Sequence, residues 1–131
     1  FMPGFLPNPS SYVGLFDIFA LSSVSEQFPI SLIEAMAAGL PVVSTDVGDV
    51  RNMVSAENRG FIISDEDEGR FGAMLSRMTG DESLRQTLGQ ANRAKAVAEY
   101  GEADMLARYS ALYEQAMGRP GALSGLEKRQ R

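Results

Sequence analysis

The sequence predicts an α/β fold in which a small parallel sheet is flanked by helices. Two observations predict this class: short apolar runs at about 17–23, 41–45 and 61–64, and helical segments that alternate with them. Right-handed crossovers between parallel strands place the loops after Ser23 and Thr45 together, at the carboxyl ends of the strands. A ligand is therefore expected at that edge of the sheet.

The first strand and helix follow a turn-rich beginning. A short amphipathic piece at about 11–16 precedes the apolar run "DIFALSS" at 17–23, which is typical of a strand buried on both faces. The segment "PISLIEAMAA" at 29–38 predicts a helix, because proline is tolerated in a first turn and because Gly39 and Pro41 end the pattern. These elements form the first two parts of a βαβ unit.

The second strand, "PVVST" at 41–45, completes that unit. The third strand, "FIIS" at 61–64, comes after a short helical piece near 50–54 and the turn "NRG". The rest of the chain has helical periodicity, which predicts helices at 66–78 after Asp65, at 81–100 after Gly80 and at 102–117 after Gly101.

The last predicted helix carries an apolar face. At 3.6-residue spacing this face predicts a packed surface made of Met105, Tyr109, Leu112, Tyr113 and Ala116. Beyond Gly118 the sequence has no period and ends in basic residues. We therefore expect one domain over 1–117 and a flexible tail over 118–131.

Composition excludes several kinds of chemistry. The 131 residues include no cysteine and no histidine, so disulfides, thiol nucleophiles and the commonest general base and metal ligand are all missing. The 12 basic and 17 acidic residues give a formal charge of −5, which disfavours a nucleic-acid partner. No run approaches the roughly 20 apolar residues of a membrane span. We expect a cytoplasmic chain that works with carboxylates, hydroxyls and backbone amides.

Two glutamates stand around the start of the predicted helix at 29–38. A helix start presents unpaired N–H groups and about half a positive charge, which suits a phosphate. Glu34 lies in the second turn, and its side chain leans toward the helix start, while Glu26 lies in the loop that enters the helix. One carboxylate could bind a ribose and the other a sugar, with a diphosphate on the amides between them.

Both glutamates also have ordinary interpretations. Ser31 and Glu34 match the Ser-x-x-Glu capping box, in which the glutamate only accepts a hydrogen bond from a backbone N–H at the helix start. A lone loop carboxylate such as Glu26 is more often solvated than functional.

The run "DIFALSSVSEQFPISLIEAMAAGLPVVSTDVG" resembles the C-terminal, donor-binding domain of retaining GT-B glycosyltransferases of family 4. The hallmark of that family is Glu, seven residues, Glu, and here Glu26 and Glu34 hold those positions. The resemblance runs from Phe1 to about Met117 and implies part of a Rossmann-like, six-stranded domain that starts near the end of its third strand. It also implies that the acceptor domain, and an Arg and a Lys that neutralise the diphosphate, belong before Phe1.

The resemblance assigns roles to individual positions. Glu34 would bind the ribose hydroxyls, and Glu26 would be the catalytic contact to a donor sugar hydroxyl. The other donor-binding residues implied are Gly4 and Phe5 beside the nucleobase, Phe28, and the amides of Ile30, Ser31 and Leu32 around the diphosphate. The reaction would join a nucleotide-sugar and an acceptor hydroxyl to give a glycoside with retention and a nucleoside diphosphate, without a cofactor or an essential metal.

Departures from the family pattern bear on donor preference. Gln27 and Pro29 stand where glycines are usual, and Pro29 removes one N–H from the phosphate-binding position. Asp49 replaces the second glycine of a common Gly-Gly pair, and Ser22 stands where proline is frequent.

Other classes fit the sequence less well. A phosphoacceptor receiver domain needs an Asp where "FALSS" offers serines, and a dinucleotide-binding domain needs a Gly-x-Gly-x-x-Gly that does not occur. The remaining alternative is a non-catalytic α/β fragment that binds no donor and self-associates. Its far edge at 17–23 would be open, so we expect a homo-oligomer, a swapped element, or residues 1–6 in the vacant place.

Overall fold

The computed structural model describes residues 4, 5 and 7–123, and the chain divides into two compact units, 1–97 and 98–131. The predicted contributions of 1–3 and Leu6, and most of the predicted tail, lie outside the described residues.

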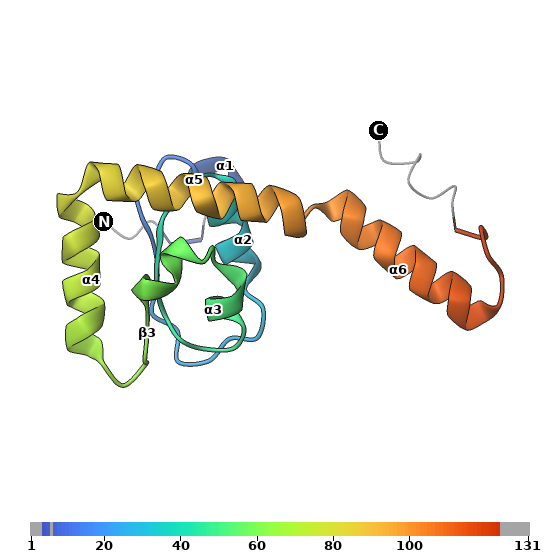
Figure 1. Ribbon diagram of the computed structural model, residues 1–131, viewed down its shortest axis with the longest axis horizontal. Helices are drawn as coiled ribbons and strands as arrows, with labels where there is room; N and C mark the ends of the chain where they lie inside the picture. The colour runs from blue at the N-terminus through green and yellow to red at the C-terminus, as the bar shows by residue number, and fades with distance from the viewer. Residues whose placement is uncertain (1–3, 6, 124–131) are drawn as a thin grey trace. The chain divides into compact units, whose positions relative to one another are not determined.

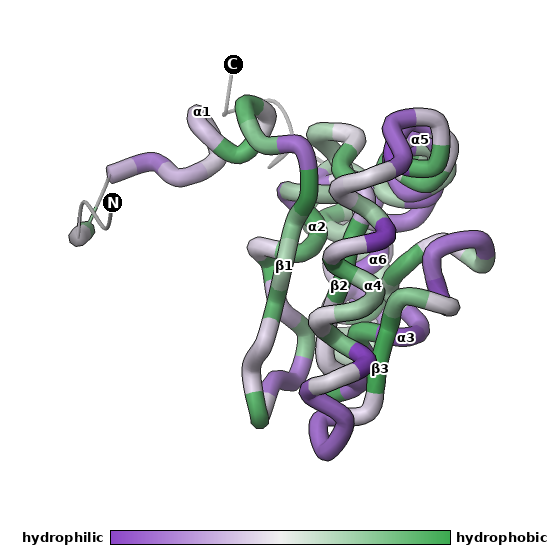
Figure 2. Tube along the Cα trace, turned by 90° about the vertical axis from the view of Figure 1, so that its left-hand side faces the viewer, coloured by the Kyte–Doolittle hydropathy of each residue, from purple (hydrophilic) through white to green (hydrophobic). Residues whose placement is uncertain are grey.

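The first unit contains a three-stranded parallel sheet, as the sequence predicts. Its strands are β1 (Phe19–Leu21), β2 (Val42–Thr45) and β3 (Ile62–Ile63), and they lie side by side in that order (Figure 2). β2 is central and all four of its residues are buried. All three strands run in one direction, so the loops that follow them meet at one edge of the sheet.

Helices cover the sheet on two sides. Figure 1 shows α4 (Glu68–Gly80) on one side of β3, and α2 (Ile30–Ala37) and α3 (Val50–Met53) on the other. The remaining elements of this part of the chain are a short α1 (Ser10–Val13), the 3-10 helix η1 (Glu57–Phe61) and the long α5 (Glu82–Glu99).

The core lies on both sides of β2. Val43 packs with Phe61, with Met78 of α4 and with Leu88 of α5. Helix α2 buries one face completely through Leu32, Ala35 and Met36, which follows from their i, i+3, i+4 spacing. The predicted helix at 29–38 is therefore confirmed, together with the apolar face that attaches it to the domain.

The first strand corrects one expectation. The run at 17–23 was expected to be buried on both faces, but Ala20 is exposed, and Phe19 and Leu21 are only partly buried. The reason is position: β1 is an edge of the sheet, and apolar composition alone does not distinguish an edge strand from a central one. Helix α4 also begins later than predicted, because the Asp67 carboxylate, rather than Asp65, accepts from the Arg70 N–H at 2.9 Å.

The second unit contains α6 (Glu102–Met117), which begins after Gly101 as predicted. Its apolar face is not packed as the sequence predicts, since Leu112 is 60% exposed and Met105, Tyr109 and Tyr113 are each about half exposed. Periodicity identifies an apolar face but not the surface that covers it.

A short turn follows α6. Gly118 ends the helix with a φ of 62°, and the Glu114 carboxylate accepts hydrogen bonds from the N–H groups of Leu123 at 2.8 Å and Gly121 at 2.9 Å. These two bonds hold the pKa of Glu114 below its usual value. Among residues 4, 5 and 7–123, no helix is both long and apolar enough to cross a membrane.

Candidate functional site

The start of α2 lies at the carboxyl edge of the sheet. Pro29 is the N-cap residue, with extended backbone, and it provides no side-chain cap. The Leu32 N–H donates to the Pro29 carbonyl at 3.2 Å, and the Leu32 side chain is fully buried. In the described part of the chain, the N–H groups of Ile30 and Ser31 have no partner, so these two remain available to an anion.

Glu34 is the fifth residue of α2 and is partly buried. The capping-box interpretation is wrong, because that motif places Ser31 before the helix, whereas the helix already begins at Ile30. Within the described residues, the Glu34 carboxylate makes no hydrogen bond or ion pair. Cα–Cβ bonds in a helix tilt toward its N-terminus, so a residue in this turn can direct its carboxylate toward a ligand at the helix start.

Glu26 lies in the loop between β1 and α2 and is partly buried. One oxygen of its carboxylate accepts a hydrogen bond from the Ser23 hydroxyl, with 2.8 Å between Oγ and Oε1. Glu26 is therefore held by a short-range contact rather than freely solvated, which differs from the ordinary interpretation of a lone loop carboxylate.

The loop after β2 holds the Glu26 loop from the side. The Thr45 hydroxyl donates to the Ser23 carbonyl at 2.5 Å, and the Asp49 N–H donates to the Gln27 carbonyl at 3.0 Å. Gly48, with a φ of 53°, lies so close to the Glu26 and Gln27 carbonyls that an added Cβ would be 2.6 Å from the Gln27 oxygen. The two loops that the sequence places at one edge are thus in direct contact.

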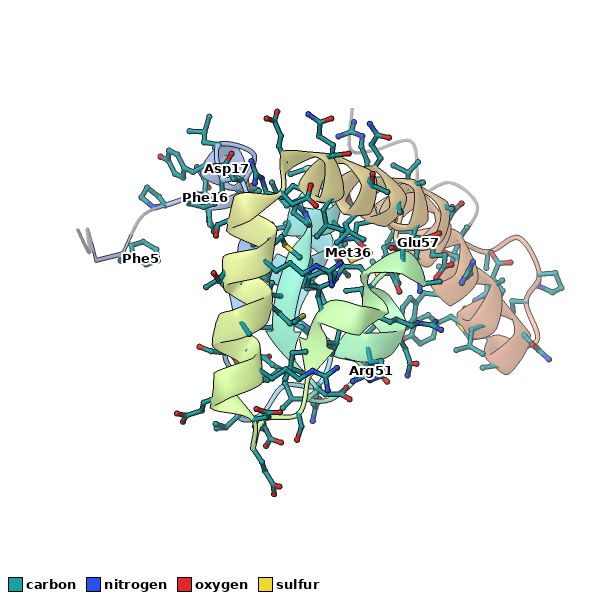
Figure 3. The ribbon with its side chains drawn as sticks, turned by 60° about the vertical axis from the view of Figure 1, so that its left-hand side comes forward. Phe5, Phe16, Asp17, Met36, Arg51 and Glu57 are labelled. Carbon is teal, nitrogen blue, oxygen red and sulfur yellow. The ribbon has the colours of Figure 1, made fainter. Side chains whose placement is uncertain are left out.

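The same second loop is also connected to β3. Arg51 pairs with Asp46 at 2.6 Å and donates to the Ile62 carbonyl at 2.8 Å, while the Asp46 N–H donates to the Ile63 carbonyl at 2.7 Å. Figure 3 shows Arg51 and Asp17 at opposite ends of the strands. The loop after β1, the loop after β2 and the strand β3 are therefore linked into one framework.

Several predicted site residues have exposed side chains. Phe28 and Ile30 lie at the helix start with exposed side chains, 48% and 70% respectively, where a ligand could cover them. Phe5 is 92% exposed and stands apart from the packed helices in Figure 3, and Gly4 beside it is also exposed. Both predicted nucleobase residues are thus exposed in the structure.

A hollow of about 240 Å³ lies at the opposite end of the sheet, between the start of β1 and the start of α5. Its charged and polar lining comes from Asp17, Glu82, Arg85 and Gln86. Arg85 already donates to the Met78 and Thr79 carbonyls, and the carboxyl end of α2 at Gly39 faces the hollow. A helix end of negative polarity beside two carboxylates is unsuited to a diphosphate, so chemistry favours the carboxyl edge.

Sequence reasoning missed three residues of this site. Ser23, Thr45 and Gly48 hold the Glu26 loop, and none was expected to do so. The available signal was a hydroxyl residue at the end of each of the predicted strands 17–23 and 41–45, since the carboxyl ends of neighbouring parallel strands lie close together. Among residues 4, 5 and 7–123 there is no cluster of three or more carboxylates placed to hold a metal ion.

The chain has a GT-B-like α/β fold and is a domain of a glycosyltransferase family. Residues 1–95 match the family described as Glycosyl transferases group 1, and the chain belongs to that family.

Similar proteins agree with this assignment. Over 110 residues the chain is 30% identical to the D-inositol 3-phosphate glycosyltransferase of Jonesia denitrificans. The aligned region covers 82% of this chain and 26% of that protein. It is 24% identical over 106 residues to the N-acetyl-alpha-D-glucosaminyl L-malate synthase of Bacillus anthracis, and here the aligned region covers 81% of this chain and 28% of that protein.

Among solved structures, the sucrose-phosphate synthase of Thermosynechococcus elongatus superposes with a TM-score of 0.78 at 25% identity, over 84% of this chain and 28% of that one. The chain spans roughly a quarter of the length of these similar proteins.

Proposed function

We propose that this chain forms the donor-binding part of a retaining glycosyltransferase of family 4 and that its donor is a nucleotide-sugar. Family membership supports sugar transfer and does not favour the non-catalytic alternative. The observation that carries the donor-binding role is the start of α2, where the unpaired N–H groups of Ile30 and Ser31 lie one turn before the unpartnered carboxylate of Glu34.

Each part of a nucleotide-sugar has a matching group at this edge. The diphosphate would lie on the Ile30 and Ser31 amides, which carry the positive end of the helix dipole. Ribose hydroxyls would donate to Glu34, and a hydroxyl of the donor sugar would donate to Glu26. Leu32 contributes through packing alone, because its N–H is already bound to Pro29.

The transfer itself would break the bond between the sugar and the diphosphate and form one to an acceptor hydroxyl. Negative charge then builds on the departing phosphates, and preorganised donors stabilise such charge in the transition state. In this proposal the nucleotide-sugar is a substrate, no metal ion is required, and the acceptor is bound by a part of the enzyme other than this edge.

Titration of the 131-residue chain with UDP, GDP and ADP tests the proposal. We expect one of these nucleoside diphosphates to bind in isothermal titration calorimetry. Glu34→Gln should weaken that binding by about tenfold or more, because a charged acceptor is replaced by a neutral one.

Glu57→Gln is the matched control, since Glu57 is an exposed carboxylate on η1 and outside the carboxyl-edge loops (Figure 3). Glu57→Gln should bind the nucleoside diphosphate with the same affinity as the unmodified chain. The proposal fails if none of the three nucleotides binds at millimolar concentration, or if Glu34→Gln and Glu57→Gln bind equally well.

A further inference from the structure

Three residues form a connected series from the end of the central strand to Glu26. The Thr45 hydroxyl donates to the Ser23 carbonyl at 2.5 Å and lies 3.4 Å from the Leu21 carbonyl. The Ser23 hydroxyl in turn donates to Glu26 Oε1 at 2.8 Å. The series therefore starts on the central strand and ends on a carboxylate of the proposed donor site.

The anchor of this series is rigid. Thr45 is only 8% exposed and ends β2, the strand that pairs on both sides. By contrast, Val24 and Ser25, which separate Ser23 from Glu26, are exposed, so packing of that turn does not fix the Glu26 side chain. The Ser23 hydroxyl is the group that fixes the Glu26 side chain.

We propose that Ser23 is a positioning residue for Glu26, a role that rests on the proposed function. By occupying Oε1 it leaves Oε2 as the oxygen that accepts from a hydroxyl of the donor sugar. A carboxylate held in place before the ligand arrives loses less conformational freedom on binding, so the sugar is bound more tightly. The nucleotide half of the donor does not depend on this contact.

Comparison of a nucleoside diphosphate with its sugar ester separates positioning from a general structural role. The probes are UDP with UDP-glucose, GDP with GDP-mannose, and ADP with ADP-glucose, each titrated into the full 131-residue chain. Ser23→Ala should weaken the nucleotide-sugar by about tenfold while the nucleoside diphosphate keeps its affinity. Ser23→Thr, which keeps the hydroxyl, should restore nucleotide-sugar binding.

A ligand-free measurement tests the same proposal independently. Three-bond couplings between Hα and Hβ of Glu26, measured by NMR, should show one dominant rotamer in the unmodified chain and in Ser23→Thr. In Ser23→Ala they should show rotamer averaging.

Unchanged couplings in Ser23→Ala would overturn the positioning role. An equal loss of affinity for the nucleoside diphosphate and for the corresponding nucleotide-sugar would overturn it too. If the unmodified chain binds no nucleotide, the proposed function fails, while the couplings still decide whether Ser23 holds Glu26.

Discussion

Gly48 is the residue at which the backbone of the site tolerates least change. Its φ of 53° belongs to the left-handed region, which costs a residue with a Cβ roughly 1–2 kcal/mol. An added Cβ would also overlap the carbonyls of Glu26 and Gln27. We predict that Gly48→Ala lowers the free energy of unfolding by about 2 kcal/mol or more, measured by urea denaturation followed by circular dichroism.

Gly72→Ala is the matched control for that prediction. Gly72 lies inside α4, and nothing lies within 4 Å of a Cβ added there. Alanine in a helix interior is about 0.5–1 kcal/mol more favourable than glycine, so this substitution should stabilise the chain. If Gly48→Ala left the urea midpoint unchanged or raised it as Gly72→Ala does, the close approach at Gly48 would not limit stability.

Glu34 shows what residue spacing can and cannot predict. Its place near the helix start followed from the sequence, because Pro29 and the apolar spacing after it indicate the start of α2 to within about two residues. The capping box was an alternative interpretation of the same residues, and it requires the helix to begin after Ser31 rather than at Ile30. A shift of two residues decides between a structural and an unpartnered carboxylate, and local pattern does not resolve such shifts.

At the scale of elements, two buried asparagines join β2 to the helices. β3 begins opposite Ser44, so Val42 has no strand partner on that side. The Asn58 side chain takes that place: its Oδ1 accepts from the Val42 N–H at 2.9 Å, and its Nδ2 donates to the Val42 carbonyl at 2.7 Å. Asn92 of α5 donates to Asn58 Oδ1 at 2.9 Å and to the Leu40 carbonyl at 3.0 Å.

We predict that Asn92→Ala destabilises the first unit strongly. The Ser55 N–H, which donates to Asn92 Oδ1 at 3.1 Å, and the Leu40 carbonyl would both be left buried and unpaired. Each such group costs about 1–3 kcal/mol, so urea denaturation should show a loss of about 3 kcal/mol in the free energy of unfolding. Gln90→Ala, at an exposed position of the same helix, should change it by less than about 0.5 kcal/mol. A loss no larger than that of the control would contradict this role of Asn92.

The elements themselves were largely predictable, and their surroundings were not. The order of strands and helices followed from apolar runs punctuated by glycine and proline, and helix ends fell within about two residues of those predicted. The asparagine pair was missed because its partners lie 34 residues apart in sequence. The exposure of Ala20 and of the α6 face was missed because burial depends on neighbours, which periodicity does not specify.

At the scale of the whole molecule, the main feature is β1, the edge strand of the sheet among the residues that the structure describes. Within the residues that the structure describes, no strand lies beyond β1, and Gly4 and Phe5 form no strand. The Phe19 N–H donates to the Pro41 carbonyl at 3.0 Å, so Phe19 pairs with β2. Successive residues of a strand direct their backbone groups to opposite sides, which leaves the N–H and carbonyl of Ala20 facing outward.

We predict that this edge pairs with a second copy of the chain. An unpaired strand edge beside apolar side chains is a template for further strand addition, so light scattering should show a mass that rises with protein concentration. Ala20→Pro removes the outward N–H without touching the bonds to β2, because proline is tolerated on the open side of an edge strand. It should therefore lower the association constant about tenfold or more, whereas Ala20→Ser, which keeps the N–H, should associate like the unmodified chain. Association that is equal in the proline and serine variants would place the contact on another surface, such as the exposed apolar face of α6, and would contradict pairing through β1.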